Sequence, residues 1–280
     1  MKKNRKTVIT IILIIVTVLA IGFFAYSKTH QSSIKVAADN TSDNSTVSVS
    51  AQAAVATPPI EPPKTTYSGK IPILMYHYIR DYADQSDPIG VGLSVSPAKF
   101  AAQLDYLQLN DYKTITFLDV EKNNVPPKAI ILTFDDGYID FYQNAYPELK
   151  RRGMTAVSYI VTSFNGGRYL DDSQIKEIAD YGIEIGSHTI SHLNLAMTSS
   201  VRAQKEINDS RPILERVIGK PIISFCYPTG KYSDSVVSTV KNAGYKYAAT
   251  TKGGLADFTD PFRLYRYRMN SETNIASAIK

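Results

Sequence analysis

The strongest constraint on the fold of this chain is the alternation of short apolar runs with amphipathic segments from Tyr67 onward. Apolar runs that indicate buried strands lie at residues 71–76, 128–134, 154–161, 184–187, 222–226 and 247–250. Strands that alternate with helices predict a parallel sheet, either open or closed into a barrel. In both arrangements the functional site lies at the carboxyl ends of the strands.

The segments between these runs carry helix signals. Ser96 and Pro97 place a capping side chain and a proline at the start of a helix. The apolar residues on one face of that helix are Phe100, Leu104 and Leu107. Further helices are predicted at residues 139–152, 173–181, 201–218 and 233–243. Pro212 is expected to kink or split the third of these.

An uncharged, almost continuously apolar run occupies residues 7–26. A helix of this length spans roughly 30 Å, the thickness of the apolar core of a bilayer. Basic residues at positions 2, 3, 5 and 6 predict that the amino terminus stays in the cytoplasm. The alternative is a cleaved signal peptide, but its apolar core is usually about 7–15 residues long. Residues 1–27 are therefore expected to anchor the chain in the cell membrane as a single-pass segment. The remainder is then extracellular, or secreted if the segment is cleaved.

A polar segment at residues 28–66 separates the apolar run from the strand-forming part. It is rich in Ser, Thr, Ala, Asp and Pro and lacks hydrophobic periodicity, which predicts a disordered linker. The expected organisation is thus an anchor (1–27), a linker (28–66) and a folded domain (67–280).

The net charge of +5 is concentrated near the amino terminus. Seven of the 31 basic residues and three of the 26 acidic residues precede Tyr67, which leaves 24 against 23 in the remainder. A basic face for a nucleic acid is therefore not expected. The one cysteine, Cys226, excludes an intrachain disulfide.

Two adjacent carboxylates follow the second predicted strand, in the sequence Thr133-Phe134-Asp135-Asp136-Gly137. The glycine allows the chain to turn sharply where the strand ends. Two acids at such a corner can take different roles, one as a metal ligand and the other as a free base. The alternative for an isolated motif of this kind is a helix cap with a solvated neighbour.

Two histidines, His188 and His192, follow the fourth predicted strand. If a helix begins after His188, the spacing of four residues places both imidazoles on one face, where they can share a metal ion. The alternative is a pair of hydrogen-bonded histidines without a metal. The chain has only four histidines, and two of them occur in this motif.

Two imidazoles and one carboxylate form a ligand set that suits Zn²⁺ and related divalent ions such as Co²⁺ or Ni²⁺. The same set serves non-haem iron oxygenases. A hydrolase needs a base beside the metal, and Asp135 supplies one. The two motifs together favour a metal-dependent hydrolase.

The strand predicted at residues 222–226 ends in a turn that contains Tyr227 and Thr229. These two residues are candidates for oxyanion or substrate contacts, because backbone N–H groups of the turn can face the site. The alternative is an ordinary turn without a function.

The sequence from Thr133 to Gly137, together with His188-x-x-x-His192, resembles the signature of the polysaccharide deacetylase family (carbohydrate esterase family 4, the NodB-homology domain). The resemblance extends over roughly residues 71–269, in the order of the family's motifs. It implies a distorted (β/α)₇ barrel that removes acetyl groups from polysaccharides.

The resemblance also implies roles for single residues. Asp135 becomes the catalytic base, and Asp136, His188 and His192 become the metal ligands.

Two departures from the family pattern point to one branch of it. Cys226 stands where the Arg of an Arg-x-Pro-x-Gly motif is expected, and no histidine follows His192. His77, at the end of the first strand, instead matches the branch similar to poly-β-1,6-N-acetylglucosamine deacetylases, in which the acid histidine comes from the first strand. In that branch a late arginine replaces the missing one, and Arg266 is the first candidate and Arg268 the second. The alternatives are a packed histidine and surface arginines.

Together these features predict an enzyme that removes N-acetyl groups from N-acetylglucosamine residues of an extracellular bacterial polysaccharide, either exopolysaccharide or peptidoglycan. Two alternatives stay open. One is an esterase that removes O-acetyl groups, and the other is a catalytically inactive wall-polysaccharide-binding protein, which the loss of the usual arginine motivates. Cys226 is interpreted as a small buried residue rather than a nucleophile.

Overall fold

The computed structural model describes residues 67–279. The predicted anchor at residues 7–26 and the predicted linker at residues 28–66 lie outside the described residues. Among the helices of residues 67–279, none combines the length and the apolarity that a membrane crossing requires. The described part is the one in which the sequence predicts alternating strands and helices.

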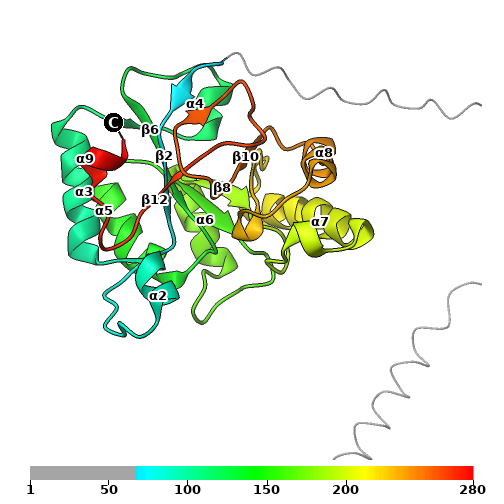
Figure 1. Cartoon of the computed structure of the whole chain (residues 1–280), viewed down its shortest axis with the longest axis horizontal. Helices are drawn as coiled ribbons and strands as arrows, with labels where there is room; N and C mark the ends of the chain where they lie inside the picture. The colour runs from blue at the N-terminus through cyan, green and yellow to red at the C-terminus, as the bar shows by residue number, and fades with distance from the viewer. Residues whose placement is uncertain (1–66, 280) are drawn as a thin grey trace, which may run out of the picture. The chain divides into compact units, whose positions relative to one another are not determined.

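The centre of the fold is an eight-stranded parallel sheet (Figure 1). Its strands are β2 (Ile73–Tyr76), β5 (Lys113–Thr114), β6 (Ala129–Phe134), β7 (Val157–Ile160), β8 (Glu184–Ser187), β9 (Ser224–Cys226), β10 (Tyr247–Ala249) and β12 (Tyr267–Arg268). Their order is β10-β9-β8-β7-β6-β2-β12, with β5 paired to β6. The predicted parallel sheet is confirmed.

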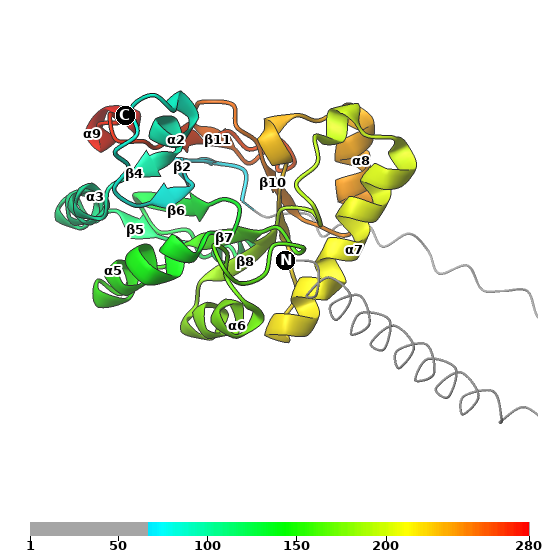
Figure 2. The same cartoon turned by 90° about the horizontal axis from the view of Figure 1, so that it is seen from below.

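One extended stretch of chain bridges the two ends of this sheet. Leu264 donates its N–H to the Ala248 carbonyl (3.0 Å) and accepts the N–H of Thr250 (2.9 Å), which attaches it to the β10 end. A few residues later the chain pairs with β2 as β12, at the other end. The strands therefore curl around an interior (Figure 2).

Pro72 divides the first predicted strand in two. Before it, β1 (Lys70–Ile71) pairs antiparallel with β11 (Ala256–Asp257), and after it β2 joins the main sheet. A proline has no N–H to donate to a strand ladder, so the chain changes partners here. Just beyond β2, a further small sheet pairs β3 (Tyr78–Ile79) with β4 (Ser94–Val95).

The longer helices lie on the outer side of the curled strands. Figures 1 and 2 show α3, α5, α6, α7 and α8 ranged around the sheet. The α-helices are α2 (Pro88–Leu93), α3 (Pro97–Leu109), α4 (Phe117–Glu121), α5 (Tyr146–Arg151), α6 (Asp172–Tyr181), α7 (Ser200–Ile218), α8 (Asp234–Asn242) and α9 (Ile275–Ala278). Short helical turns of other types are η1 (Phe141–Ala145), η2 (Leu195–Met197) and η3 (Pro228–Gly230).

Two helices test the sequence predictions directly. α3 begins as predicted, because the Ser96 hydroxyl oxygen accepts the Lys99 N–H at 3.2 Å. α7 runs through Pro212 without a break, so the helix is not split there, whereas a kink at Pro212 stays a prediction. The carbonyl that loses its bond to the missing N–H belongs to Asn208, and since both residues are exposed, water can satisfy it.

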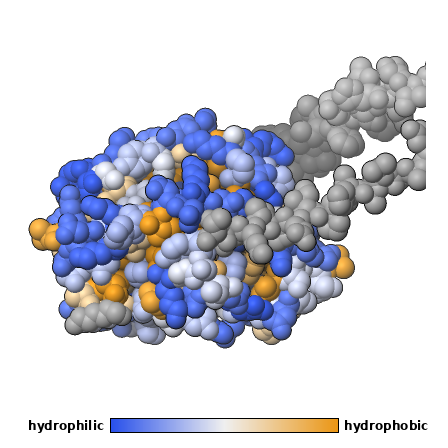
Figure 3. Space-filling model, turned by 90° about the horizontal axis from the view of Figure 1, so that it is seen from above, coloured by the Kyte–Doolittle hydropathy of each residue, from blue (hydrophilic) through white to orange (hydrophobic). Residues whose placement is uncertain are grey.

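Side chains alternate between two apolar clusters along the strands, as the two-residue period of a strand requires. On β6, Ile130, Leu132 and Phe134 belong to the cluster packed against the helices, whereas Ala129 and Ile131 belong to a second cluster inside the curl. The face shown in Figure 3 is mostly hydrophilic, with apolar residues in small separate patches. The strand alternation thus decides which side chains face the interior.

One carboxylate lies in this interior at the start of β8. Glu184 is 4% exposed and accepts hydrogen bonds from the Leu118 N–H (3.1 Å) and the Ser224 hydroxyl (2.5 Å). Burial raises the pKa of Glu184 to about 7. The folded state therefore holds a proton on this group at pH values where the unfolded chain has released it.

The free energy of unfolding should consequently fall as the pH rises from 4.5, the ordinary pKa of this group, to about 7. Because the pKa in the folded state is raised, the stability that protonated Glu184 contributes is present below pH 4.5 and lost above pH 7. We expect the natural chain to lose about 3 kcal/mol relative to Glu184→Gln across this window. Chemical denaturation of both proteins at the two pH values measures the difference, and parallel pH profiles contradict the prediction.

Candidate active site

The strand alternation directs the chemically active side chains into the interior at the carboxyl ends of the strands. His77 follows β2, Asp135 follows β6 and His188 follows β8, each in register with the inward-facing residues of its strand. Cys226 ends β9 inside the curl. Residues far apart in the sequence therefore meet at one end of the sheet.

Arg266 is fully buried and places its guanidinium on Asp135. Nη1 donates to Asp135 Oδ1 at 2.7 Å and Nη2 to Oδ2 at 2.8 Å. Nε donates to the Thr250 carbonyl at 2.8 Å, and Nη1 also donates to Thr133 Oγ1 at 2.9 Å. This bidentate contact fixes the position and the plane of the carboxylate. Of the two predicted late arginines, Arg266 makes this contact, whereas Arg268 is exposed.

The ion pair sets the charge state of Asp135. Burial alone raises the pKa of this carboxyl, but the Arg266 guanidinium outweighs burial and holds the pKa at about 2. Asp135 is therefore ionised at neutral pH although its side chain is only 2% exposed.

Asp136, His188 and His192 form a second group beside this pair. The Nε2 atoms of His188 and His192 lie 3.4 and 3.2 Å from Asp136 Oδ1, and the three candidate ligand atoms lie within 4.8 Å of one another. Asp136 Oδ1 is buried and has no hydrogen-bond partner among the described residues. An orphaned carboxylate oxygen beside two imidazole nitrogens fits a divalent cation such as Zn²⁺.

Cys226 sets the tautomer of His188. His188 Nδ1 lies 2.7 Å from the Cys226 carbonyl oxygen, so Nδ1 is a donor and Nε2 is the atom that faces Asp136 and is available to a metal. The Cys226 thiol lies 3.1 Å from Arg266 Nη2, and burial raises its pKa. Cys226 therefore acts through its backbone and its small volume, which agrees with the interpretation as a buried residue.

The chain from His188 to His192 forms a tight turn and not the helix that the spacing suggested. Glu206 on α7 holds this turn, because its carboxylate accepts the N–H groups of Ile190 (3.0 Å) and Ser191 (2.8 Å). Sequence reasoning missed Glu206, since nothing in the α7 sequence indicates which loop its carboxylate contacts.

Left-handed backbone conformations gather at this end of the sheet. The non-glycine residues with positive φ here are Asp136 (74°), Thr189 (69°), His192 (57°) and Thr229 (56°). Such conformations persist where the surrounding structure enforces them, and they are frequent at functional sites. Gly137 follows with φ of 71°, and a Cβ at this position would lie 3.1 Å from the Ile160 side chain.

His77 lies next to the buried ion pair. Its Nε2 is 3.8 Å from Asp135 Oδ2, and its side chain is 11% exposed. Burial lowers the pKa of His77, while the charges of Asp135 and Asp136 oppose this effect. The predicted acid and the predicted base are thus neighbours.

Tyr227 and Thr229, the two residues predicted to contact the oxyanion or the substrate, differ in their exposure to solvent. Tyr227 is fully buried, its N–H donates to the Ala249 carbonyl (3.1 Å), and its hydroxyl donates to the Phe262 carbonyl (3.0 Å). Both donors are taken, so the structure does not support Tyr227 as a substrate contact. Thr229 is exposed and lies on η3, just past the carboxyl end of β9.

Several known proteins are similar in sequence to this chain. Residues 122–248 match the family described as Polysaccharide deacetylase. YxkH of Bacillus subtilis (strain 168), which its name assigns to the polysaccharide deacetylases, is 33% identical over 214 residues, or 74% of this chain and 74% of that protein. The poly-beta-1,6-N-acetyl-D-glucosamine N-deacetylase of Staphylococcus aureus (strain MRSA252) is 27% identical over 173 residues. That match covers 55% of this chain and 60% of the relative.

The fold has counterparts among solved structures. Streptococcus pyogenes deacetylase PplD, solved in complex with acetate, is similar with a TM-score of 0.71 and 28% sequence identity. The match covers 76% of this chain and 100% of that one. The sequence identity to YxkH over most of both proteins carries the assignment, and this chain belongs to the polysaccharide deacetylase family.

Proposed function

We propose that this chain is a metal-dependent hydrolase that removes N-acetyl groups from N-acetylglucosamine residues of an extracellular bacterial polysaccharide. The observation that carries the proposal is the buried Asp135–Arg266 pair, with His77 on one side and the group of Asp136, His188 and His192 on the other. A base, an acid and a set of metal ligands are all available within one site.

Asp136, His188 and His192 would hold the divalent ion, for which Zn²⁺ suits the donor set best and Co²⁺ or Ni²⁺ are alternatives. When bound, such an ion polarises the acetyl carbonyl and acidifies the attacking water, so that a carboxylate as weakly basic as Asp135 can accept its proton.

The other steps belong to side chains and backbone groups of this chain. Asp135 takes the proton of the attacking water, and Arg266 keeps the carboxylate ionised and aimed. His77 donates a proton to the departing sugar amine, and its lowered pKa makes the imidazolium the stronger acid. The backbone N–H of Thr229 is a candidate donor to the oxyanion.

The two alternative functions are an inactive binding protein and an esterase. The reason to suspect an inactive binding protein was the missing motif arginine, and the contact of Arg266 with Asp135 removes that reason. An esterase acting on O-acetyl groups would use the same chemistry. The name of the Staphylococcus aureus relative supports the N-acetyl substrate. Release of acetate together with a free amine from a poly-N-acetylglucosamine oligomer distinguishes the two reactions.

We also propose that residues 1–27 anchor the enzyme in the cell membrane, with the catalytic domain extracellular. The proposal rests on the apolar run at residues 7–26 and the basic residues before it. Membrane fractionation of cells that express the full chain, compared with a chain that begins at residue 28, tests it.

Asp135→Asn should abolish deacetylation, with a loss of at least about 10²-fold in kcat, because the base is removed. The variant should still bind zinc, since Asp135 is not among the proposed ligands. His188→Ala is the matched variant that should lose both activity and zinc. Bound metal is measured by mass spectrometry and activity by free-amine formation, and near-normal turnover in Asp135→Asn contradicts the assignment.

His77→Gln should lower kcat by about 10²- to 10⁴-fold, as expected when a general acid is lost. Its zinc content should equal that of the natural chain, because His77 is not a proposed ligand. A kcat within threefold of the natural value would rule out the proposed acid.

Arg266→Met should lower both activity and the free energy of unfolding. Breaking a buried ion pair costs about 3–5 kcal/mol, because Asp135 is left buried without a partner. Arg268→Met is the matched control, since Arg268 is exposed and should change neither quantity strongly. Thermal melts and turnover are compared, and equal effects at the two positions would refute the assignment of Arg266.

A further inference from the structure

A cavity of about 330 Å³ lies beside the catalytic residues, and no step of the proposed reaction uses it. Its lining residues are Tyr78, Arg80, Tyr138, Ile139, Asp140 and Arg168. Tyr78 directly follows His77, and Tyr138 is two residues beyond Asp136. The rings of Tyr78 and Tyr138 stack with their centroids 3.8 Å apart, so the segments that follow His77 and Asp136 form one wall of this cavity.

The cavity contains a buried acceptor without a partner. Asp140 is 8% exposed, and its Oδ2 accepts the Ile79 N–H at 3.0 Å. Its Oδ1 is buried and has no hydrogen-bond partner among the described residues. Leaving such an oxygen unsatisfied costs free energy, so a ligand hydroxyl that donates to it would be favoured.

Arg80 supplies a positive charge that the surrounding structure holds in place. Its guanidinium lies over the ring of Tyr78 at 3.5 Å and over the ring of Tyr82 at 4.5 Å, and Nε donates to Ser94 Oγ at 3.2 Å. No ion pair with a carboxylate is recorded for it within residues 67–279. The planar group is thus pre-oriented and keeps N–H donors for an anion.

Arg168 supplies a second positive charge at the same cavity. It is exposed, and its side chain has no ion pair among the described residues. By contrast, Arg152 and Arg263 each pair with two carboxylates. The cavity is therefore lined by two guanidinium groups and by one carboxylate, that of Asp140.

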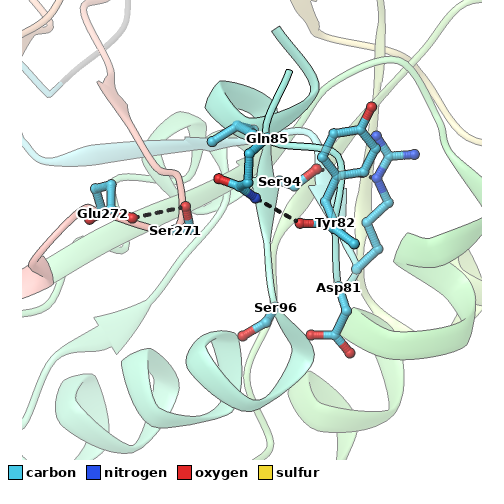
Figure 4. Close-up of a pocket in the computed structure, with 10 residues that line it drawn as sticks. Asp81, Tyr82, Gln85, Ser94, Ser96, Ser271 and Glu272 are labelled. Carbon is cyan, nitrogen blue, oxygen red and sulfur yellow. Dashed lines mark hydrogen bonds between the residues drawn. The ribbon is translucent and has the colours of Figure 1, made fainter. Parts of the chain in front are cut away.

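A neighbouring cavity has a different charge. It has a volume of about 390 Å³ and shares Arg80 with the first one, but Asp81 and Glu272 also line it (Figure 4). Its serine and glutamine side chains are uncharged. Of these two cavities, the one lined by Arg80 and Arg168 has more positive than negative lining residues.

We propose that the cavity lined by Arg80, Asp140 and Arg168 binds the sugar adjacent to the one that is deacetylated, and that it selects a sugar carrying a carboxylate or a phosphate. Asp140 Oδ1 accepts a sugar hydroxyl, and the two guanidinium groups donate to the anionic substituent. The inference rests on the proposed deacetylase function and specifies its substrate class as an acidic glycan.

Arg168→Gln is the variant that tests the selection, because Arg168 is exposed and takes no part in the proposed catalysis. Arg168→Lys keeps the charge, and Arg202→Gln is a matched control at another exposed arginine, on α7, for which no ion pair is recorded within residues 67–279. Zinc-loaded enzyme is assayed on three N-acetylglucosamine oligomers of equal length. One is neutral, one carries lactyl carboxylates on alternate residues as in peptidoglycan, and one carries phosphate.

The natural chain should show a lower KM for at least one anionic oligomer than for the neutral one. Arg168→Gln should raise that KM about fivefold, as expected for loss of one partly exposed charge contact, with kcat unchanged. Arg168→Lys should recover part of the loss, and Arg202→Gln should behave as the natural chain. The anionic preference should weaken with added salt, because salt screens exposed charges. The oligomer that responds identifies carboxylate or phosphate as the anion.

Two results would overturn the inference while the proposed function stands. One is an equal KM of the natural chain for neutral and anionic oligomers, and the other is an equal response of Arg168→Gln on both. Failure of the natural chain to release acetate from any oligomer would instead refute the proposed function. Calorimetric binding of the same oligomers to Asp135→Asn then still tests the cavity, and an unchanged affinity after adding Arg168→Gln would overturn it.

Discussion

The bidentate contact between Arg266 and Asp135 is the interaction on which the site depends. Each group alone would be an uncompensated charge in an apolar interior, and together with Thr133 and Thr250 they satisfy each other. Arg266 belongs to the stretch that joins the β10 end of the sheet to β2. The same short stretch of chain therefore contacts both ends of the sheet and holds Asp135 ionised.

Cys226 occupies the position at which an arginine is expected from the Arg-x-Pro-x-Gly motif, and Arg266 supplies the guanidinium to Asp135 instead. The expected arginine position holds a side chain small enough to leave room for Arg266, whose Nη2 lies 3.1 Å from the sulfur. The Cys226 carbonyl meanwhile orients His188. Residues 226 and 266 are therefore in contact, so a substitution at one position changes the surroundings of the side chain at the other.

The sequence predicts the strands and the residues that follow them well, because a two-residue period and terminal polar residues are local signals. The positions of His77, Asp135 and His188 directly after strands could be predicted in this way. Local signals do not reveal how a loop folds between its ends. The spacing of His188 and His192 left a helix possible there, and the turn that forms instead is held by the carboxylate of Glu206, which comes from a separate helix.

Other features of the structure likewise depend on surroundings that local sequence signals do not reveal. The continuity of α7 through Pro212 depends on which side of the helix meets water. Tyr227 is buried, and its hydroxyl donates to the carbonyl of Phe262, which is 35 residues away in the sequence. The sequence does not show whether Arg266 or Arg268 contacts Asp135. Only the burial of Arg266 and the exposure of Arg268 in the folded chain distinguish the two residues.

The stretch that connects β10 to β2 also has a consequence for how the protein folds. Arg266 is 131 residues away from Asp135 along the chain, and Met269 bonds to Met75 at the opposite end of the described sequence. Contacts between such distant segments form slowly, because a long loop must close before they contribute. We expect a refolding chain to build helices and neighbouring strands early and to position Asp135 only when the stretch around Arg266 has joined β2. Recovery of turnover therefore reports the final step of folding rather than the first collapse.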